Sequence, residues 1–431
     1  MKIIEGFNKA KASFLRQTTD ATKVDDEREK TVRQIVNDVR QRGDAALFYY
    51  TEKFDGVKLT SLEVDKKSIN RAYQETDKEF LDALKLAAER ITAYHLEQKK
   101  KLVQENKSAK LGWLMRPLRS VGVHVPGFSA PLPSSLLMTV IPARTAGVKE
   151  IILVTPPQSN GNVSPITLAA AKIAGVDRVF SVGGAQAIAA LAFGTESIPK
   201  VDKVCGPGNI YVTLAKKAVY GMVGIDGLYG PSEVIIIADE TANAEYVAAD
   251  LLAQAEHGSL ASAMMITTSK KMASDVNDEI EKQLKALQRR DITAESLAKR
   301  GLIALVDSVD QAIELANLYA PEHLCLNVKD AASYIEKVNN AGCLFVGEDS
   351  IEALVDYVAG PSHVLPTEGT ARFGSVLNIL DFMKLISLVK TGKADIKQLG
   401  WAAMVIARAE GLDAHARAVE KRLEDAGQGG S

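Results

Sequence analysis

Four of the six histidines of this chain lie beyond residue 250, and each has a carboxylate or amide side chain close by in the sequence. Imidazole and carboxylate groups bind borderline metal ions and move protons near neutral pH. Because the chain has few histidines and places these four near carboxylate or amide side chains, we expect these segments to form one chemical site. The four histidines are His257, His323, His363 and His415.

The first candidates are metal ligands. Gln254 and His257 stand three residues apart at the end of an expected helix, residues 243–256, so their side chains share one face. Asp356 and His415 can add a carboxylate oxygen and a second imidazole, and this donor set suits Zn²⁺ with room for substrate. Alternatively, His257 only complements the dipole at the end of its helix.

Glu322 and His323 are the candidates for proton transfer. They follow a proline after an expected helix, and on a loop both side chains can reach the same pocket. The imidazole could take a proton from a substrate alcohol, and the carboxylate could activate water. The alternative is a helix-end pair with an ordinary solvated carboxylate.

The elements that must position these residues alternate between strand and helix. The expected strands are residues 121–125, 150–155, 177–182, 201–205, 233–238, 263–267, 302–306 and 344–347. The expected helices between them are residues 166–173, 185–193, 210–219, 243–256, 271–287 and 309–319. Strands separated by single helices predict parallel sheets with right-handed crossovers. We therefore expect an α/β fold with two modules, at about residues 126–232 and 233–377.

Helical segments flank these modules. Before them, one helix has Val32, Ile35, Val36 and Val39 at helical spacing, and a second, residues 78–100, offers Leu81, Leu84, Leu86 and Ile91 to a core. Residues 136–141 form a further apolar segment, and the chain after Phe382 is expected to be helical.

The composition excludes several classes of protein. The formal net charge is −2, which predicts neither a nucleic-acid partner nor an anionic membrane surface. The start of the chain lacks a signal-peptide core and no apolar run spans a membrane, so a cytoplasmic protein is expected. Cys205, Cys325 and Cys343 form no CxxC motif, which indicates a reducing compartment, and the last two read as packing residues rather than nucleophiles.

Two glycine-rich segments join a strand to a helix, at residues 183–186 and 206–209. Such turns let backbone N–H groups approach a dinucleotide phosphate at a helix N-terminus. No Gly-x-Gly-x-x-Gly pattern follows any expected strand, and purely structural tight turns are the alternative.

Taken together, seven segments resemble the histidinol dehydrogenase family, in the right order and across nearly the whole chain. They are residues 182–196, 200–203 with 206–209, 230–234, 249–258, 320–324, 363–367 and 410–415. The resemblance implies a four-electron oxidation of L-histidinol to L-histidine through a held aldehyde, with zinc and two NAD⁺. It also implies a homodimer with shared active sites.

Residue roles follow from the same resemblance. The implied zinc ligands are Gln254, His257, Asp356 and His415, and the implied acid–base pair is Glu322 and His323. Further implied substrate contacts, beside the zinc ligands and His323, are Ser232, His363 and Glu410. The implied NAD contacts are Gln186, Asn209 and the position of His124, where the family usually has a tyrosine.

The implied fold is two incomplete Rossmann-like modules, one inserted in the other, with a helical N-terminal segment and a C-terminal dimerisation arm. The expected divisions are a tail at 1–24, a first module at 25–125 plus 233–377, an insert at 126–232, and the arm at 378–431. Besides His124, two positions depart from the family pattern: Phe128 replaces a usual glycine, and Tyr229 replaces a usual alanine.

Other functions remain open from the residues alone. A related NAD-dependent dehydrogenase could act on another small polar alcohol or diol, and the bulky rings of Phe128 and Tyr229 are compatible with that. A zinc hydrolase would need the metal and Glu322 but no dinucleotide. A metal-binding protein without catalysis would need neither Glu322 nor His323.

Overall fold

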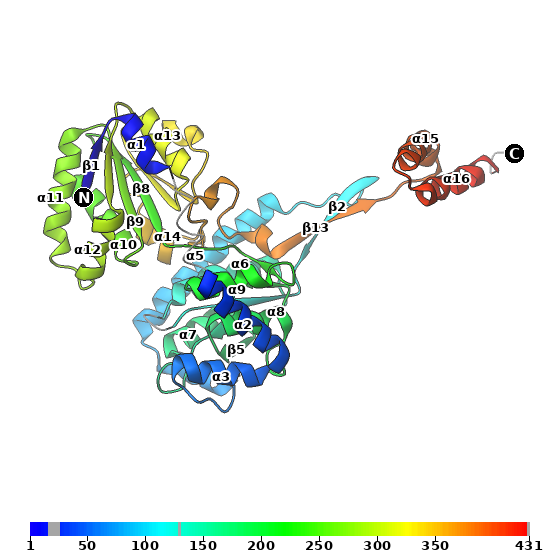
Figure 1. Ribbon diagram of the computed structural model, residues 1–431, viewed down its shortest axis with the longest axis horizontal. Helices are drawn as coiled ribbons and strands as arrows, with labels where there is room; N and C mark the ends of the chain where they lie inside the picture. Colours follow the sequence, from blue (N-terminus) through cyan, green and yellow to red (C-terminus); the bar gives the residue numbers. More distant parts are fainter. Residues whose placement is uncertain (16–25, 128–130, 429–431) are drawn as a thin grey trace. The chain divides into compact units, whose positions relative to one another are not determined.

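The computed structural model describes residues 1–15, 26–127 and 131–428, so Phe128 lies outside the described residues. The chain divides into two compact units, here called the first and the second unit. The first is Met1–Lys99 with Leu118–Phe382, and the second is Lys100–Pro117 with Met383–Ser431. The first unit contains two parallel sheets covered by helices (Figure 1). The predicted α/β fold with parallel sheets is confirmed.

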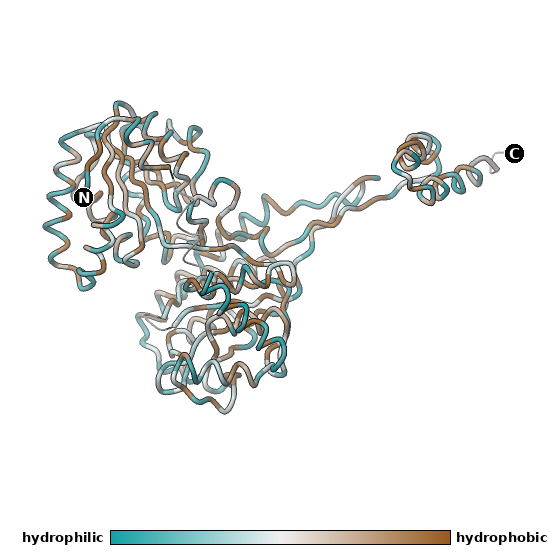
Figure 2. The backbone as a smooth tube through the Cα atoms, viewed as in Figure 1, coloured by the Kyte–Doolittle hydropathy of each residue, from teal (hydrophilic) through white to brown (hydrophobic). Residues whose placement is uncertain are grey.

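The larger sheet has six parallel strands. Their order across the sheet is β1 (Lys2–Glu5), β10 (Leu302–Leu305), β9 (Ser262–Thr267), β8 (Glu233–Ala238), β11 (His323–Asn327) and β12 (Cys343–Val346). One face packs on α10 (Ala244–Ala255), α11 (Lys270–Leu284) and α12 (Arg290–Arg300), and the other on α1 (Phe7–Phe14) and α13 (Val309–Tyr319). Every residue of β8, β9 and β11 is buried, which explains their nearly continuous apolar sequences. Figure 2 shows this hydrophobicity along the strands.

The smaller sheet has five parallel strands. Their order is β5 (Arg178–Ser181), β4 (Glu150–Thr155), β3 (Ser120–His124), β6 (Lys203–Cys205) and β7 (Gly224–Ile225). One face packs on α8 (Gly184–Phe193) and α9 (Ile210–Val219), on which α2 (Asp26–Arg42) and α3 (Asp44–Asp55) form an outer layer, and the other face packs on α6 (Pro133–Ala146) and α7 (Pro165–Ala174). Outside the sheets lie α4 (Lys66–Glu75), which packs on α7, and the long helix α5 (Lys78–Leu102).

Several expected elements have the expected bounds. β4, β8, α9 and α13 begin and end at the predicted residues, and α2 buries its four predicted valine and isoleucine side chains. Residues 136–141 belong to α6. Leu86 is wrong as a core residue of α5, because its side chain is exposed and Ala87 is buried instead.

The division between the sheets differs from the expected one. β3 begins the smaller sheet at Ser120, not after residue 125, and α2 and α3 pack on α8 and α9 rather than on the larger sheet. The expected N-terminal tail contains β1, which pairs with β10 as the edge strand of the larger sheet, while its residues 16–25 lie outside the described part. These are tertiary contacts between distant segments, and local patterns do not encode them.

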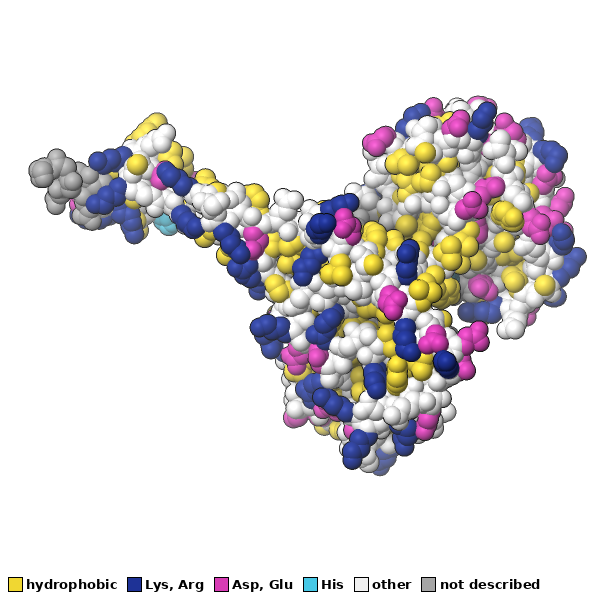
Figure 3. All heavy atoms as spheres, turned by 180° about the vertical axis from the view of Figure 1, so that it is seen from behind, with side chains coloured by type: hydrophobic (Ala, Val, Ile, Leu, Met, Phe, Trp, Pro, Cys, Tyr) yellow, Lys and Arg dark blue, Asp and Glu magenta, His cyan; other side chains and the backbone are white. Residues whose placement is uncertain are grey.

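The second unit is a two-stranded ribbon and a helical pair. β2 (Leu111–Pro117) pairs antiparallel with β13 (Met383–Val389), so the expectation of helix directly after Phe382 is wrong for seven residues. α15 (Lys393–Ala409) packs on α16 (Asp413–Gln428) through Gly400, the one buried residue of α15. Trp401, Val405 and Ile406 are exposed, and hydrophobic side chains lie open on this unit in Figure 3.

Among the described residues, no helix is both long and apolar enough to cross a membrane.

Candidate active site

A pocket of about 230 Å³ opens in the first unit beside the amino ends of β8 and β11. Ser232 precedes β8, Glu322 precedes β11, and His323 is the first residue of β11, so His323 lies on a strand rather than the expected loop. The smaller sheet contributes Pro207 and Tyr229 to the same lining. The predicted site residues that line the pocket are Ser232, His257, Glu322, His323, Asp356 and His363.

Glu322 and His323 are both buried at this position. Glu322 Oε2 accepts a hydrogen bond from the backbone N–H of Glu233 at 2.9 Å. His323 Nδ1 lies 4.0 Å from Glu322 Oε2 and 3.5 Å from Glu352 Oε2. Neither ring nitrogen of His323 has a hydrogen-bond partner among the described residues. Two unpartnered nitrogens on a buried ring indicate a ligand or substrate position.

Burial shifts both groups toward their neutral forms. The pKa of His323 is lowered to about 3, chiefly because burial removes water from the ring. The nearby rings of His257 and His363 contribute to the same shift. Loss of hydration raises the pKa of Glu322 well above its usual value, although the N–H of Glu233 opposes the shift. Both groups are therefore shifted toward their neutral forms, which leaves the imidazole with one ring nitrogen that can accept a hydrogen bond from a ligand.

A cluster of donor atoms adjoins this pair. His257, Glu352 and Asp356 each offer one ligand atom, and these atoms all lie within 4.8 Å of one another. One nitrogen and two carboxylate oxygens at this spacing can hold a divalent cation. The sequence reasoning had identified His257 and Asp356, and it had missed Glu352. Glu352 stands four residues before Asp356 on the short helix α14 (Glu352–Tyr357), and that spacing was the signal available.

Gln254 is buried at the end of α10, next to the same cluster. Its amide orientation follows from hydrogen bonding: the nitrogen donates to Glu352 Oε1 at 2.5 Å, and the oxygen accepts from the N–H of Glu233 at 2.6 Å. Glu352 therefore contacts Gln254 on one side and faces His323 on the other. The N–H of Glu233 in turn serves both Gln254 and Glu322.

His257 and Asp356 influence each other's protonation. Loss of hydration lowers the pKa of His257, and Asp356 opposes this shift. Burial raises the pKa of Asp356 to about 6, and His257 opposes that shift. The side chain of His257 is exposed and lines the pocket, so its ring can receive a ligand there.

His363 connects the pocket to α6 of the smaller sheet. Its Nε2 lies 3.1 Å from Ser135 Oγ, and its Nδ1 lies 2.8 Å from the backbone oxygen of Asp356. Burial lowers the pKa of His363, so the neutral ring donates to the Asp356 carbonyl through Nδ1 and accepts from the serine hydroxyl through Nε2.

The three predicted cofactor residues lie at the carboxyl edge of the smaller sheet. His124 ends β3, Gln186 stands in the first turn of α8, and Asn209 caps α9 by accepting from the N–H groups of Tyr211 and Val212. These residues surround the junction of β3 with β6, where the chain order of the strands reverses, and open α/β sheets bind ligands at such a point.

The remaining predicted residues belong to the second unit. Glu410 is the C-terminal cap of α15, His415 lies in the first turn of α16, and both are exposed. Tyr229, one of the departures noted above, lines the pocket with its ring, while its hydroxyl interacts with Asp226.

A buried Glu–His pair, an adjoining cluster of side chains that could hold a metal ion, and a strand-order reversal in the smaller sheet are together typical of an α/β enzyme. Comparison with known proteins agrees. The family model for histidinol dehydrogenase matches residues 18–423. A histidinol dehydrogenase of Dehalococcoides mccartyi strain CBDB1 is 56% identical over 436 residues, with 98% of this chain and 100% of the relative covered.

Two further relatives extend the comparison. A histidinol dehydrogenase of Bacillus cereus is 47% identical over 425 residues, which cover 98% of this chain and 99% of the relative. The crystal structure of histidinol dehydrogenase from Elizabethkingia anophelis matches with a TM-score of 0.92 at 38% identity, covering 99% of this chain and 98% of that one. The chain belongs to the histidinol dehydrogenase family and is an oxidoreductase.

Proposed function

We propose that this protein oxidises L-histidinol to L-histidine through the aldehyde, with zinc as the metal and two NAD⁺ as hydride acceptors. The observation that carries the proposal is the buried ring of His323, unpartnered at both nitrogens among the described residues and beside a cation cluster. Family membership supplies the class of reaction. The pocket supplies the groups that a stepwise alcohol oxidation needs.

The donor set of the cluster fits zinc. His257 and Asp356 offer nitrogen and oxygen ligands, and Gln254 adjoins them. The family resemblance adds His415 as a further imidazole. Zinc bound there would hold the amine and imidazole of the substrate and fix the orientation of its alcohol. Glu352 either joins the ligands or holds the Gln254 amide in place.

The acid–base pair divides the proton transfers. In the first oxidation, neutral His323 takes the proton of the alcohol as a hydride leaves the same carbon, which yields the aldehyde. Glu322 then takes a proton from water as the water oxygen adds to the aldehyde. His323 returns its proton to the former aldehyde oxygen, which gives the hydrated aldehyde with two hydroxyl groups. In the second oxidation a hydride leaves the hydrated carbon and His323 accepts the proton of one hydroxyl, which yields the carboxylic acid. Ser232 and His363 line the pocket as substrate contacts.

The smaller sheet is proposed as the NAD-binding module. The strands of that sheet can be counted from first to fifth in chain order, beginning with β3. Across the sheet they then lie in the order third, second, first, fourth and fifth, which is the order of Rossmann-like domains. The glycine-rich turns before α8 and α9 carry Gln186 and Asn209 at its carboxyl edge. The start of α8, where no side chain caps the helix, suits a pyrophosphate.

We further propose a homodimer in which the second unit of one chain completes the site of the other. α15 leaves Trp401, Val405 and Ile406 exposed, and a helical pair with so open an apolar face is stabilised by a partner surface. His415 and Glu410 would then reach the partner's pocket, and the second unit would act as the dimerisation arm.

Spectrophotometric stoichiometry tests the proposed reaction. Purified protein with zinc, excess NAD⁺ and a limiting amount of L-histidinol is expected to form two NADH per histidinol. A parallel panel of small polar alcohols and diols tests the substrate class, and a sample stripped with a chelator tests the metal. Absence of NADH with L-histidinol would refute the proposal, and one NADH per histidinol would refute the four-electron course.

A further inference from the structure

Two glycine-rich turns meet beside the end of β3. The first, Gly183 and Gly184, follows β5 and opens α8, and the second, residues 206–209, follows β6 and opens α9. His124, the last residue of β3, lies between them with only 2% of its surface exposed. Both turns lie at the edge that the proposed function assigns to NAD⁺, and a ring in this position can control their spacing.

The His124 ring bonds the backbone of both turns. Its Nδ1 lies 2.8 Å from the carbonyl oxygen of Pro207, and the N–H of Gly184 donates to its Nε2 at 3.3 Å. Burial lowers the pKa of His124 to about 4, so the ring is neutral at physiological pH. A neutral imidazole has one donor and one acceptor, and here the Nδ1–H donates to Pro207 while Nε2 accepts from Gly184.

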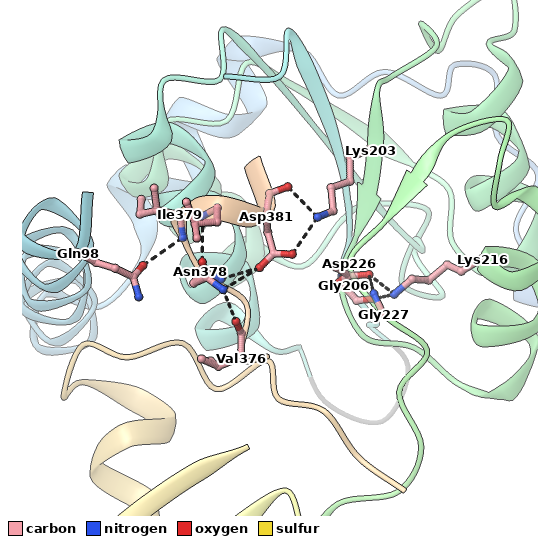
Figure 4. A network of polar contacts seen from close by, with 11 residues as sticks. Gln98, Lys203, Gly206, Lys216, Asp226, Gly227, Val376, Asn378, Ile379 and Asp381 are labelled. Carbon is pink, nitrogen blue, oxygen red and sulfur yellow. Dashed lines mark hydrogen bonds and ion pairs between the residues drawn. The ribbon is translucent and has the colours of Figure 1, made fainter. Parts of the chain in front are cut away.

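A buried ion pair, Lys216 with Asp226, also holds the second turn (Figure 4). Asp226 Oδ2 accepts from the N–H of Gly206 at 2.7 Å, and Lys216 Nζ donates to the carbonyl oxygen of Gly206 at 3.1 Å. Asp226 and Lys216 also pair with each other, and the ring of Tyr229 lies 4.7 Å from Lys216 Nζ. Both backbone polar groups of Gly206 are therefore fixed by buried charges.

Gly206 leaves little freedom for an alternative arrangement. Its φ is +108°, and a Cβ at this position would lie 2.1 Å from the carbonyl oxygen of His124. The end of β3 and the start of the turn are thus in direct backbone contact. A displacement of His124 is transmitted to the second turn through this contact and to the first turn through Gly184.

We propose that His124 is a positioning residue that fastens the two glycine-rich turns to each other, so that the turns are held at the spacing in which they receive the dinucleotide. The proposal rests on the proposed NAD⁺ site. His124 acts through the turns, because its two ring nitrogens already bond backbone groups. Groups held in their bound arrangement before the ligand arrives increase affinity by lowering the cost of ordering them.

Three variants test the proposal. His124→Phe keeps a ring and removes both bonds, whereas His124→Asn keeps a donor near Pro207 and loses the acceptor for Gly184. The matched control is His95→Phe, because His95 is equally buried and its Nδ1 bonds only the carbonyl of Ile91 in its own helix. Amide hydrogen exchange without ligand is measured on peptides covering residues 182–188 and 205–213. NAD⁺ dissociation constants, Michaelis constants and zinc content are measured on the same samples.

The expected results separate the two turns. His124→Phe raises exchange in both peptides and the Kd for NAD⁺ by about tenfold, the usual effect of losing buried hydrogen bonds. The Michaelis constant for L-histidinol and the zinc content stay within about twofold, because the changed bonds lie away from the metal cluster. His124→Asn raises exchange only in the 182–188 peptide. His95→Phe changes neither peptide.

Other outcomes would overturn the proposal. Unchanged exchange in both turns of His124→Phe would show that the ring does not hold them. A uniform rise across the whole chain, matched by His95→Phe, would make His124 an ordinary packing residue. If His124→Phe does not fold, His124→Asn replaces it in the test. Exchange equal to that of the wild type in both peptides of His124→Asn would refute the proposal in the same way. If the wild-type protein binds no NAD⁺, the proposed function is refuted. The exchange measurements then still decide whether His124 fastens the turns.

Discussion

His323 is the residue whose environment is hardest to explain without a function. A buried imidazole with two unpartnered nitrogens lowers stability, because its polar atoms have lost water and gained nothing in return. Glu352 and Glu322 lie 3.5 and 4.0 Å from Nδ1, which is too far for a good hydrogen bond, so neither carboxylate satisfies the ring. The ring is therefore held ready for a partner that arrives from the pocket.

Replacement of His323 tests this role. His323→Asn is expected to lower kcat on the order of 10²–10⁴-fold, because the alcohol proton loses its acceptor. Zinc content should stay near that of the wild type, since His323 is not in the cation cluster. Steady-state rates and metal analysis on the same preparation check both statements. Wild-type turnover in a folded, zinc-loaded variant would remove His323 from the mechanism.

A second substitution, His257→Asn, tests the metal site in place of proton transfer. His257 supplies the one nitrogen of the cluster, so its loss is expected to weaken zinc binding by several powers of ten and activity with it. Chelator competition measures the zinc affinity directly, without reference to turnover. Normal zinc affinity in this variant would mean that the metal is held elsewhere.

At the scale of elements, the ends of strands and helices bring the site together. β8 and β11 are neighbours in the larger sheet, so Ser232 and Glu322, which precede them, meet at one edge. α14 is only six residues long, yet its single turn puts Glu352 and Asp356 on one face, toward His257 at the end of α10. Short elements at strand ends thus position side chains from four separate segments.

The end of α3 offers a test of how burial changes protonation. Asp55 Oδ2 has no hydrogen-bond partner among the described residues, and burial raises the pKa of Asp55 to about 6 from an ordinary 3.8. Well below pH 3.8 the carboxyl is neutral in both the folded and the unfolded chain. As pH rises from 3.8 to about 6, the unfolded chain releases the proton and the folded chain retains it, so stability falls across this window and stays at its lower value above it.

Asp55→Asn is therefore expected to raise the free energy of unfolding at pH 8 by about 1–3 kcal/mol and to have little effect at pH 4. The lower end of this range allows for the partial exposure of Asp55, because solvent screens its charge. Urea unfolding at the two pH values measures the difference. Glu52→Gln is the matched control, because it removes an exposed carboxylate from the same last turn. An equal gain at both pH values, or an equal gain in the control, would contradict the assignment to Asp55.

At the scale of the whole molecule, the open apolar face of the second unit predicts association. Mixing two inactive variants, His257→Asn and His415→Asn, tests whether chains share a site. If the second unit of one chain serves the other, each mixed dimer has one intact site, and equal mixing with free exchange restores about a quarter of the wild-type sites. Activity after unfolding and refolding the mixture measures this.

The outcome is unambiguous because a site formed within one chain cannot be rescued. In that case no mixed dimer contains an intact set of ligands, and activity stays at the level of the separate variants. The control is a doubly substituted chain mixed with wild type, which keeps activity in wild-type homodimers and creates no new site in mixed dimers.

The sequence alone determined the alternation of strands and helices and identified candidate site residues, several of which line one pocket. Buried strands and amphipathic helices have local signatures, so β4, β8, α9 and α13 were predicted to the residue. The convergence of Glu322, His323, His257 and Asp356 followed from residue types and from a family resemblance. The roles of His415 and Glu410 stay predictions.

Only the tertiary structure decided which distant segments meet. β1 completes the larger sheet, α2 and α3 pack on the smaller one, and Glu352 joins His257 and Asp356. Likewise, the order of the strands in the smaller sheet brings His124, at the end of β3, into contact with Gly184 and Pro207. Sequence patterns report how each segment buries its own face, whereas these contacts depend on packing among segments far apart in the chain, which no local pattern records.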